Sequence, residues 1–162
     1  MIAPKRPHVL YVEDDDDSCQ MMTALLEVSG IDVTCVQGMA ATLQLPDKDR
    51  FDLFLLDLWL HDGDGNDLCV KLRSEFPDIP VVFYTGVATE REEKHSLLSG
   101  AAAYLVKPYS ELIAPMILKL VAGEDAVDVF ERPAGPLQVM EQNAKKLVNI
   151  MKGGGRAMPL SP

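Results

Sequence analysis

The sequence predicts an α/β protein built on one open, doubly wound parallel sheet with helices on both faces. Four short runs are uniformly apolar rather than alternating, which is typical of strands buried on both faces of a parallel sheet. These runs are Val9–Val12, Leu53–Leu56, Val81–Tyr84 and Ala103–Val106. Segments with helical spacing or helix-capping residues separate them, so a strand–helix unit is expected five times along the chain.

Local spacing and end signals define the other elements of the first two units. The segment Asp17–Val28 carries apolar residues at helical spacing and stops before Gly30, a residue type that commonly follows a helix. Ile31–Val36 alternates apolar and polar residues, as an edge strand does. A second helix is expected at Met39–Leu45, because Pro46 cannot continue it.

Capping residues mark the remaining three helices. Asn66 is expected to cap the third helix, and Thr89, with Glu92 three residues on, the fourth. The fourth helix is polar, so we expect it to be exposed. Ser110 can cap the last helix, although Pro115 should kink it or delay its start.

Length and composition narrow the class of protein. The 162 residues suffice for one domain, and the net charge of −10 argues against a nucleic-acid surface. The N-terminus lacks the apolar core of a signal peptide, and Leu112–Ala122 is too short to span a bilayer. Cys19, Cys35 and Cys69 show no metal-binding or redox spacing, so reduced thiols in a cytoplasmic protein are expected.

Polar residues useful for phosphoryl chemistry follow four of the predicted strands. The pair Glu13-Asp14 follows the first strand, Asp57 the third, Thr85 the fourth and Lys107 the fifth. In open parallel sheets, sites form at the carboxyl ends of strands near the reversal of strand order. Carboxylates pushed together either raise a pKa or recruit a cation, and oxygen ligands around an open site suit Mg²⁺.

These residues, in this order and spacing, resemble the receiver domain of bacterial response regulators, and in particular the single-domain, chemotaxis-type receiver. The stretch Asp57–Gly65 is similar to the family's D-x-x-M-P-x-x-D-G loop, with Leu60 for Met and His61 for Pro. Gly100–Pro108 also resembles the family. The resemblance covers residues 7–121 and implies a flavodoxin-like fold with strand order 2-1-3-4-5.

The resemblance implies that Asp57 is the phosphoacceptor and that Mg²⁺ is the cofactor. At matching positions, Asp14 and Asp57 would be direct metal ligands and Glu13 a ligand through water. The backbone carbonyl of Trp59 would be a further ligand. Asp57 would then act as the nucleophile and form an aspartyl-phosphate.

The resemblance also implies a phosphorylation switch. Lys107 would offset charge on the phosphoryl oxygens, and the Thr85 hydroxyl would turn inward to bind one of them. In the family this movement is coupled to rotation of an aromatic side chain, here Tyr104, and biases the surface of helix four, strand five and helix five. Simple core packing is the alternative role for Tyr104.

Two apolar residues depart from what many relatives carry beside the site. Trp59 stands two residues after Asp57, and Val87 stands two residues after Thr85. We expect these site-flanking modulators to restrict the attacking water, so that the phosphorylated state is long-lived.

The predicted domain organisation is a lead at residues 1–6, the receiver at 7–121, and a linker, a short amphipathic helix and a flexible end at 122–162. The helix is predicted from apolar residues at helical spacing, namely Leu137, Met140, Ala144, Leu147 and Met151. No DNA-binding domain is expected there, because the segment is short and its basic residues are balanced by acids. Packing on the receiver and contact with a partner or second copy both stay open for this helix.

The leading functional hypothesis is a stand-alone response regulator in a two-component phosphorelay, not a turnover enzyme. Its donor would be a sensor histidine kinase or a histidine phosphotransfer protein, and its output would be a protein partner rather than nucleic acid or membrane. A homodimer through helix four, strand five and helix five, or through the C-terminal helix, is left open. The alternative is a phosphorylation-independent interaction module. An aspartyl phosphatase is disfavoured, because Trp59 stands where such enzymes carry a second acid.

Overall fold

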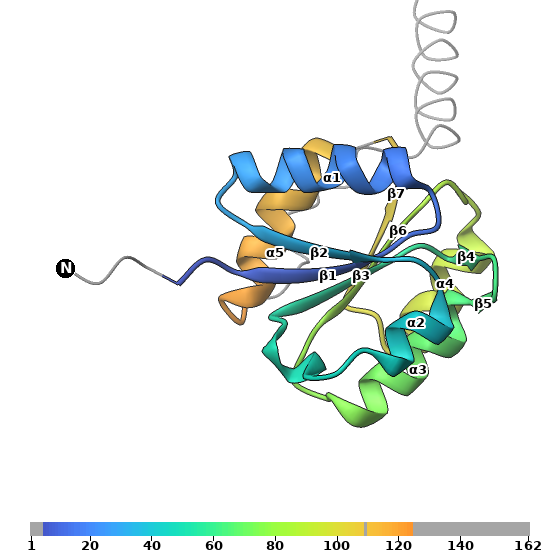
Figure 1. The fold of residues 1–162 in the computed structure, drawn as a ribbon. Helices are drawn as coiled ribbons and strands as arrows, with labels where there is room; N and C mark the ends of the chain where they lie inside the picture. Colours follow the sequence, from blue (N-terminus) through green and yellow to red (C-terminus); the bar gives the residue numbers. More distant parts are fainter. Residues whose placement is uncertain (1–4, 109, 125–162) are drawn as a thin grey trace, which may run out of the picture. The chain divides into compact units, whose positions relative to one another are not determined.

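A computed structural model describes residues 5–108 and 110–124. Its centre is one five-stranded parallel sheet in the order β2-β1-β3-β6-β7 (Figure 1). The strands are β1 (His8–Val12), β2 (Asp32–Val36), β3 (Leu53–Leu56), β6 (Val81–Thr85) and β7 (Ala103–Val106). Counted within this sheet, the order is 2-1-3-4-5, which confirms the predicted doubly wound, flavodoxin-like fold.

Helices cover both faces of the sheet, as predicted (Figure 1). On one face lie α1 (Asp16–Val28) and α5 (Ile113–Val121). On the other lie α2 (Met39–Gln44), α3 (Gly65–Glu75) and α4 (Glu90–Leu98). Short 3₁₀ turns at Lys48–Arg50 and Ser110–Leu112 complete the described helical structure.

The central strands are buried on both faces because their residues are apolar at consecutive positions. Leu10, Phe54 and Phe83 belong to the core cluster that also contains Leu68 and Leu72 of α3. Their strand neighbours point to the opposite face, since side chains alternate along a strand, and are buried as well. Strand β2 is half-buried throughout, as expected for an edge strand.

Two predicted helix caps are wrong, each by two residues. The sequence places the start of the first helix at Asp17, but Asp15 caps α1 by accepting a hydrogen bond from the Ser18 backbone N–H, so Asp17 lies inside the first turn. Likewise Asp64, not Asn66, caps α3. In both cases the carboxylate nearer the strand reaches the free N–H groups of the first turn.

The expected cap at Thr89 is confirmed, since its side chain accepts a hydrogen bond from the Glu92 backbone N–H. The last helix starts after a 3₁₀ turn at Ser110–Leu112, with Pro115 in its first turn. The delayed start agrees with the restriction that proline imposes.

The cysteine prediction is wrong for two of the three residues. Cys19 on α1 and Cys35 on β2 form a disulfide, with Cα atoms 6.0 Å apart. The reason is tertiary, because α1 packs beside β2 and brings together two cysteines that are 16 residues apart in sequence. Cys69 is a buried free thiol, as expected.

Two predicted features, the C-terminal amphipathic helix and the flexible end, cannot be compared with the described residues. The amphipathic helix and C-terminal end expected within 122–162 lie outside the described residues, apart from 122–124. Among the residues that are described, no helix is long and apolar enough to cross a membrane.

A short hairpin that the sequence did not suggest follows β3. It pairs β4 (Trp59–Leu60) with β5 (Gly63–Asp64) and leads directly into α3. The Gly65 backbone N–H donates to the Leu58 carbonyl at 2.7 Å, and a Cβ atom at Gly65 would lie 2.3 Å from the Asp57 carbonyl oxygen. The loop after β3 therefore closes only with glycine at position 65.

We expect Gly65→Ala to lower the free energy of unfolding by roughly 1–3 kcal/mol, because backbone must move to admit the methyl group. Gly86→Ala is the matched control, since a Cβ atom at Gly86 would meet no atom within 4 Å. Urea unfolding followed by circular dichroism measures both variants. Equal stability of the two would contradict the close approach at Gly65.

Candidate functional site

The four sets of polar residues that follow strands meet at the carboxyl edge of the sheet. Parallel pairing aligns Val12 with Leu56, and Leu56 with Phe83, so Glu13 and Asp57 lie side by side and Thr85 lies one residue beyond their level on β6. Glu13, Asp57 and Thr85 are all buried, with exposed fractions of 5%, 9% and 1%. Buried carboxylates need a counter-charge, because burial disfavours the ionised form.

Lys107 provides that counter-charge from the end of β7. Its ammonium nitrogen lies 2.7 Å from Asp57 Oδ2 and 2.5 Å from Glu13 Oε2. Its backbone N–H donates to the Thr85 carbonyl at 2.8 Å, which anchors it to the neighbouring strand. Burial lowers the pKa of Lys107, but hydrogen bonds and attraction from Asp57 and Glu13 outweigh it, so the pKa lies above the ordinary lysine value.

The Glu13 carboxylate is held on both oxygens. Oε1 accepts from the backbone N–H groups of Asp14 and Asp15, at 3.0 and 3.2 Å. Oε2 accepts from the Tyr11 hydroxyl at 2.8 Å as well as from Lys107. Burial and the nearby Glu13 carboxylate raise the pKa of Tyr11 far above its ordinary value. The phenol therefore stays protonated and donates a hydrogen bond to Glu13.

Sequence reasoning gave Tyr11 no role, although a signal was present. Tyr11 is the one hydroxyl-bearing residue in the run Val9–Val12, and it stands two positions before Glu13. Side chains two apart along a strand point to the same side. A tyrosine in an otherwise aliphatic strand, in step with an acid at its end, predicts such a hydrogen bond.

Asp14 is less buried than Glu13 and contacts His61. The His61 backbone N–H donates to Asp14 Oδ2, and ring Nδ1 lies 2.8 Å from Asp14 Oδ1. Hydrogen bonding and attraction from Asp14 raise the pKa of His61 above the ordinary histidine value. The sequence alone indicates no role for His61. Its place in the loop after Asp57 was the available signal, since that loop returns to the site.

Thr85, Val87 and Tyr104 are linked by two hydrogen bonds. The Val87 backbone N–H donates to Thr85 Oγ1 at 3.4 Å, and the Tyr104 hydroxyl donates to the Val87 carbonyl at 2.8 Å. Burial, with smaller contributions from Glu92 and Glu93, raises the pKa of Tyr104 to about 12. The loop after β6 therefore connects the predicted phosphate-sensing residue with the predicted aromatic switch.

Trp59 directs its backbone toward the site and its side chain largely toward solvent. Its N–H lies 3.4 Å from Asp57 Oδ1, while the residue is 59% exposed. The indole is therefore not a core residue, although it stands on the short strand β4 beside the buried Leu60.

The oxygen donors at this edge fit Mg²⁺. Within the described residues, no three His, Cys, Asp or Glu side chains form a ready-made cage for a metal. Mg²⁺ does not need one, because it is usually bound through one or two carboxylates and keeps several waters. Asp14 and Asp57 would hold it directly, with Glu13 and the Trp59 carbonyl in support.

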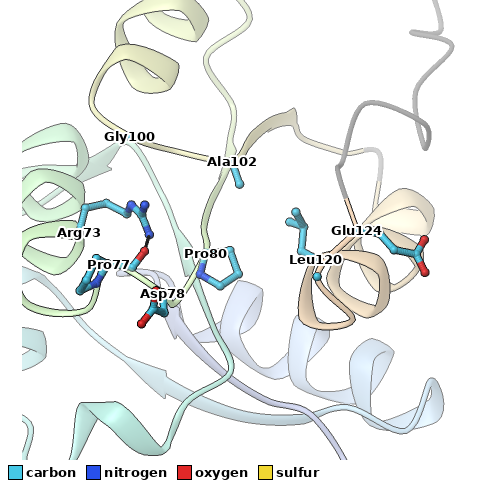
Figure 2. Close-up of a pocket in the computed structure, with 9 residues that line it drawn as sticks. Arg73, Pro77, Asp78, Pro80, Gly100, Ala102, Leu120 and Glu124 are labelled. Carbon is cyan, nitrogen blue, oxygen red and sulfur yellow. Dashed lines mark hydrogen bonds between the residues drawn. The ribbon is translucent and has the colours of Figure 1, made fainter.

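A separate pocket of about 430 Å³ opens at the opposite edge of the sheet (Figure 2). Pro80 and Ala102, which precede β6 and β7, line it, together with Arg73 and Leu120. The Arg73 guanidinium donates to the carbonyl oxygens of Pro77 and Ile79, so its charge is already engaged. We assign this pocket no part in the site.

Comparison with known proteins identifies the class that this fold and site define. Residues 9–114 match the family model of the response regulator receiver domain. The chain belongs to this family.

Individual relatives agree with this assignment. The chain is 36% identical to the sensory transduction protein RegX3 of Mycobacterium tuberculosis, a match that covers 94% of this chain and 67% of RegX3. It is 29% identical to the nisin biosynthesis regulatory protein NisR of Lactococcus lactis, over 94% of this chain and 68% of NisR. Among solved structures, a CheY-like receiver domain from Methanospirillum hungatei superimposes with a TM-score of 0.68 at 26% identity, covering 74% of this chain and 96% of that one.

We expect Tyr11→Phe to lower the free energy of unfolding by about 1 kcal/mol, because the variant loses only the hydrogen bond to Glu13. Tyr84→Phe is the matched control, since it removes a hydroxyl that makes no hydrogen bond to any described residue. Denaturant unfolding of both variants is the measurement.

A double-mutant cycle separates this bond from general packing. In a Glu13→Ala background the partner is gone, so Tyr11→Phe should cost little or nothing. An equal loss in both backgrounds would mean that Tyr11 acts through packing alone.

Proposed function

We propose that this chain accepts a phosphoryl group from a phosphohistidine donor onto Asp57, with Mg²⁺ as cofactor, and thereby controls a protein partner. The single observation that carries the proposal is the position of Asp57 Oδ2, 2.7 Å from the Lys107 ammonium at an edge that also holds Glu13 and Asp14. Such an arrangement combines a nucleophile, a cation and metal-binding oxygens.

In the proposed reaction, a carboxylate oxygen of Asp57 attacks the phosphorus atom. The phosphorus–nitrogen bond of the donor breaks, and its electron pair stays on the imidazole nitrogen. When bound, Mg²⁺ offsets negative charge on the phosphoryl oxygens. Lys107 would offset further charge on these oxygens, because its ammonium already contacts Asp57. Slow hydrolysis of the aspartyl-phosphate would reset the chain, so it is not a turnover enzyme.

The proposed readout passes from Thr85 to Tyr104. Among the described residues, the Thr85 hydroxyl oxygen accepts one long hydrogen bond, of 3.4 Å, from the Val87 N–H, so its own O–H stays available to donate to a phosphoryl oxygen. Movement of Thr85 would disturb the loop to which the Tyr104 hydroxyl is bonded. Tyr104 stands on β7, which contacts α4, and we place the contact with the downstream protein on the surface of α4, β7 and α5, called here the switching surface.

The proposed phosphodonor is a sensor histidine kinase or a histidine phosphotransfer protein. Relatives support a place in such a relay, since the sensor protein GacS of Pseudomonas syringae contains a region 28% identical to this chain over 18% of its length. A homodimer through α4, β7 and α5 would use the same surface as the downstream protein. Leu97 and Leu98 at the end of α4 are 40% and 78% exposed and would contribute to either contact.

We expect the chain to gain one phosphoryl group when incubated with Mg²⁺ and a small phosphodonor such as phosphoramidate. Asp57→Asn should abolish the gain, because an amide is not a nucleophile for phosphorus. Asp67→Asn, which changes an exposed acid on α3, should label like the wild type. Intact-mass measurement counts the group, and a chelator should prevent its addition.

An unlabelled wild-type chain with intact fold would reject the phosphorylation hypothesis. It would favour the alternative, a receiver-like module that binds its partner without phosphorylation. Labelling that survives Asp57→Asn would instead mean that another acid is the acceptor.

We also expect Trp59→Asn to shorten the lifetime of the phosphorylated state several-fold. The Trp59 backbone lies 3.4 Å from Asp57 Oδ1, and we propose that its exposed indole hinders the approach of water from the solvent side, whereas a short amide can bind a water molecule. Trp59→Phe keeps a large apolar group and should preserve the lifetime. Loss of the phosphoryl group is followed by mass after donor removal, and an unchanged lifetime in Trp59→Asn would count against a shielding role.

A further inference from the structure

The disulfide between Cys19 and Cys35 lies beside the acidic residues of the site. Cys19 is near the start of α1 and Cys35 is on the edge strand β2. Cys19 is buried and Cys35 is half-buried, so Cys35 is the more accessible of the two. Cysteine pairs of cytoplasmic proteins, when they are oxidised, are usually transient and redox-sensing.

Cys19 contacts Glu13 directly, and Cys35 is related to it through its neighbours Tyr11 and Val36. Cys19 Sγ lies 3.7 Å from the Glu13 carbonyl oxygen. Cys35 pairs in register with Tyr11, whose hydroxyl holds the Glu13 carboxylate. The Glu13 backbone N–H also donates to the carbonyl of Val36, the residue after Cys35, at 3.2 Å. The disulfide therefore joins α1, which follows the acidic pair, to β2, whose last residue accepts a hydrogen bond from Glu13.

We propose that Cys19 and Cys35 form a reversible redox-modification site whose state sets the Mg²⁺ affinity of the acidic pair. Its chemical partners are a low-molecular-weight disulfide and a dithiol. On oxidation, the two thiols lose two protons and two electrons as the S–S bond forms, and a disulfide such as glutathione disulfide takes them up and becomes two thiols. Reduction by a dithiol reverses the exchange. The inference rests on the proposed function for the identity of the metal site.

The cross-link favours the metal-bound arrangement. It ties α1 to β2 and so restricts the loop between β1 and α1, which carries Glu13 and Asp14. Less conformational freedom is then lost when these ligands close on a cation. We expect the oxidised chain to bind Mg²⁺ about fivefold more tightly, at the lower end of usual coupling between sites. By linkage, Mg²⁺ must shift the thiol–disulfide equilibrium toward the disulfide by the same factor.

Cys69 is an internal control for this exchange. It is a buried free thiol on α3, and burial raises its pKa to about 11, so little reactive thiolate is present at neutral pH. Cys69→Ser should leave the redox behaviour of the chain unchanged. Cys35→Ser should remove it while leaving Cys19 in place.

The test uses the full chain equilibrated in glutathione buffers of graded ratio, with and without Mg²⁺. After acid quenching and unfolding, alkylation and intact mass count the free thiols. We expect three free thiols in reducing buffer and one in oxidising buffer. Saturating Mg²⁺ should shift the midpoint of the thiol–disulfide equilibrium by the same factor as the change in Mg²⁺ affinity. Mg²⁺ titration by fluorescence of the single tryptophan, Trp59, in the oxidised and the reduced chain measures that affinity directly.

Three free thiols in every buffer would overturn the redox site. A disulfide that forms normally but leaves the Mg²⁺ affinity unchanged would overturn the coupling alone. Absence of any Mg²⁺ response in either redox state would overturn both the coupling and the metal site of the proposed function. If the Mg²⁺ affinity of Cys35→Ser still depended on the redox buffer, the proposal would also be rejected, because this variant cannot form the Cys19–Cys35 disulfide.

Discussion

Two nearly buried carboxylates, Glu13 and Asp57, share one ammonium group at the carboxyl edge of the sheet, and the rest of the site depends on that contact. Lys107 lies 2.5 Å from one and 2.7 Å from the other. Bringing two carboxylates together at a buried position costs free energy through desolvation and mutual repulsion, and a shared cation offsets that cost. The Lys107 ammonium therefore offsets the negative charge that Glu13 and Asp57 bring into this buried edge.

The fold brings these groups together by simple geometry. Parallel strands end at one edge, so residues placed directly after β1, β3 and β7 meet although they are far apart in sequence. Hydrogen bonds between strands fix the positions of these residues along the strand direction. For example, the Lys107 backbone N–H donates to the Thr85 carbonyl. Gly65 lets the loop after β3 fold back against Asp57, where any larger residue would collide with backbone.

A second layer of contacts fixes the orientation of the acids. Tyr11 and two backbone N–H groups hold Glu13, while His61 occupies the oxygens of Asp14. The contact with His61 has to rearrange if Asp14 is to coordinate a metal, whereas the contact with Tyr11 can persist. The disulfide adds a covalent restraint behind this layer, at the side of the site where α1 and β2 meet. Regulation by redox state, if coupled as proposed, would act through the backbone of Glu13 rather than on Asp57.

The sequence by itself determined the fold class, the strand order through its family resemblance, and the meeting of Glu13, Asp14, Asp57, Thr85 and Lys107. It could do so because uniformly apolar strands and the residues that follow them are local features, and parallel pairing then dictates where they converge. Only the tertiary structure decided which oxygen Lys107 contacts, that Tyr11 and His61 join the acids, and that Asp15 and Asp64 are the helix caps. It alone paired Cys19 with Cys35. These contacts depend on distances of a few ångströms between elements, and no pattern along one chain contains them.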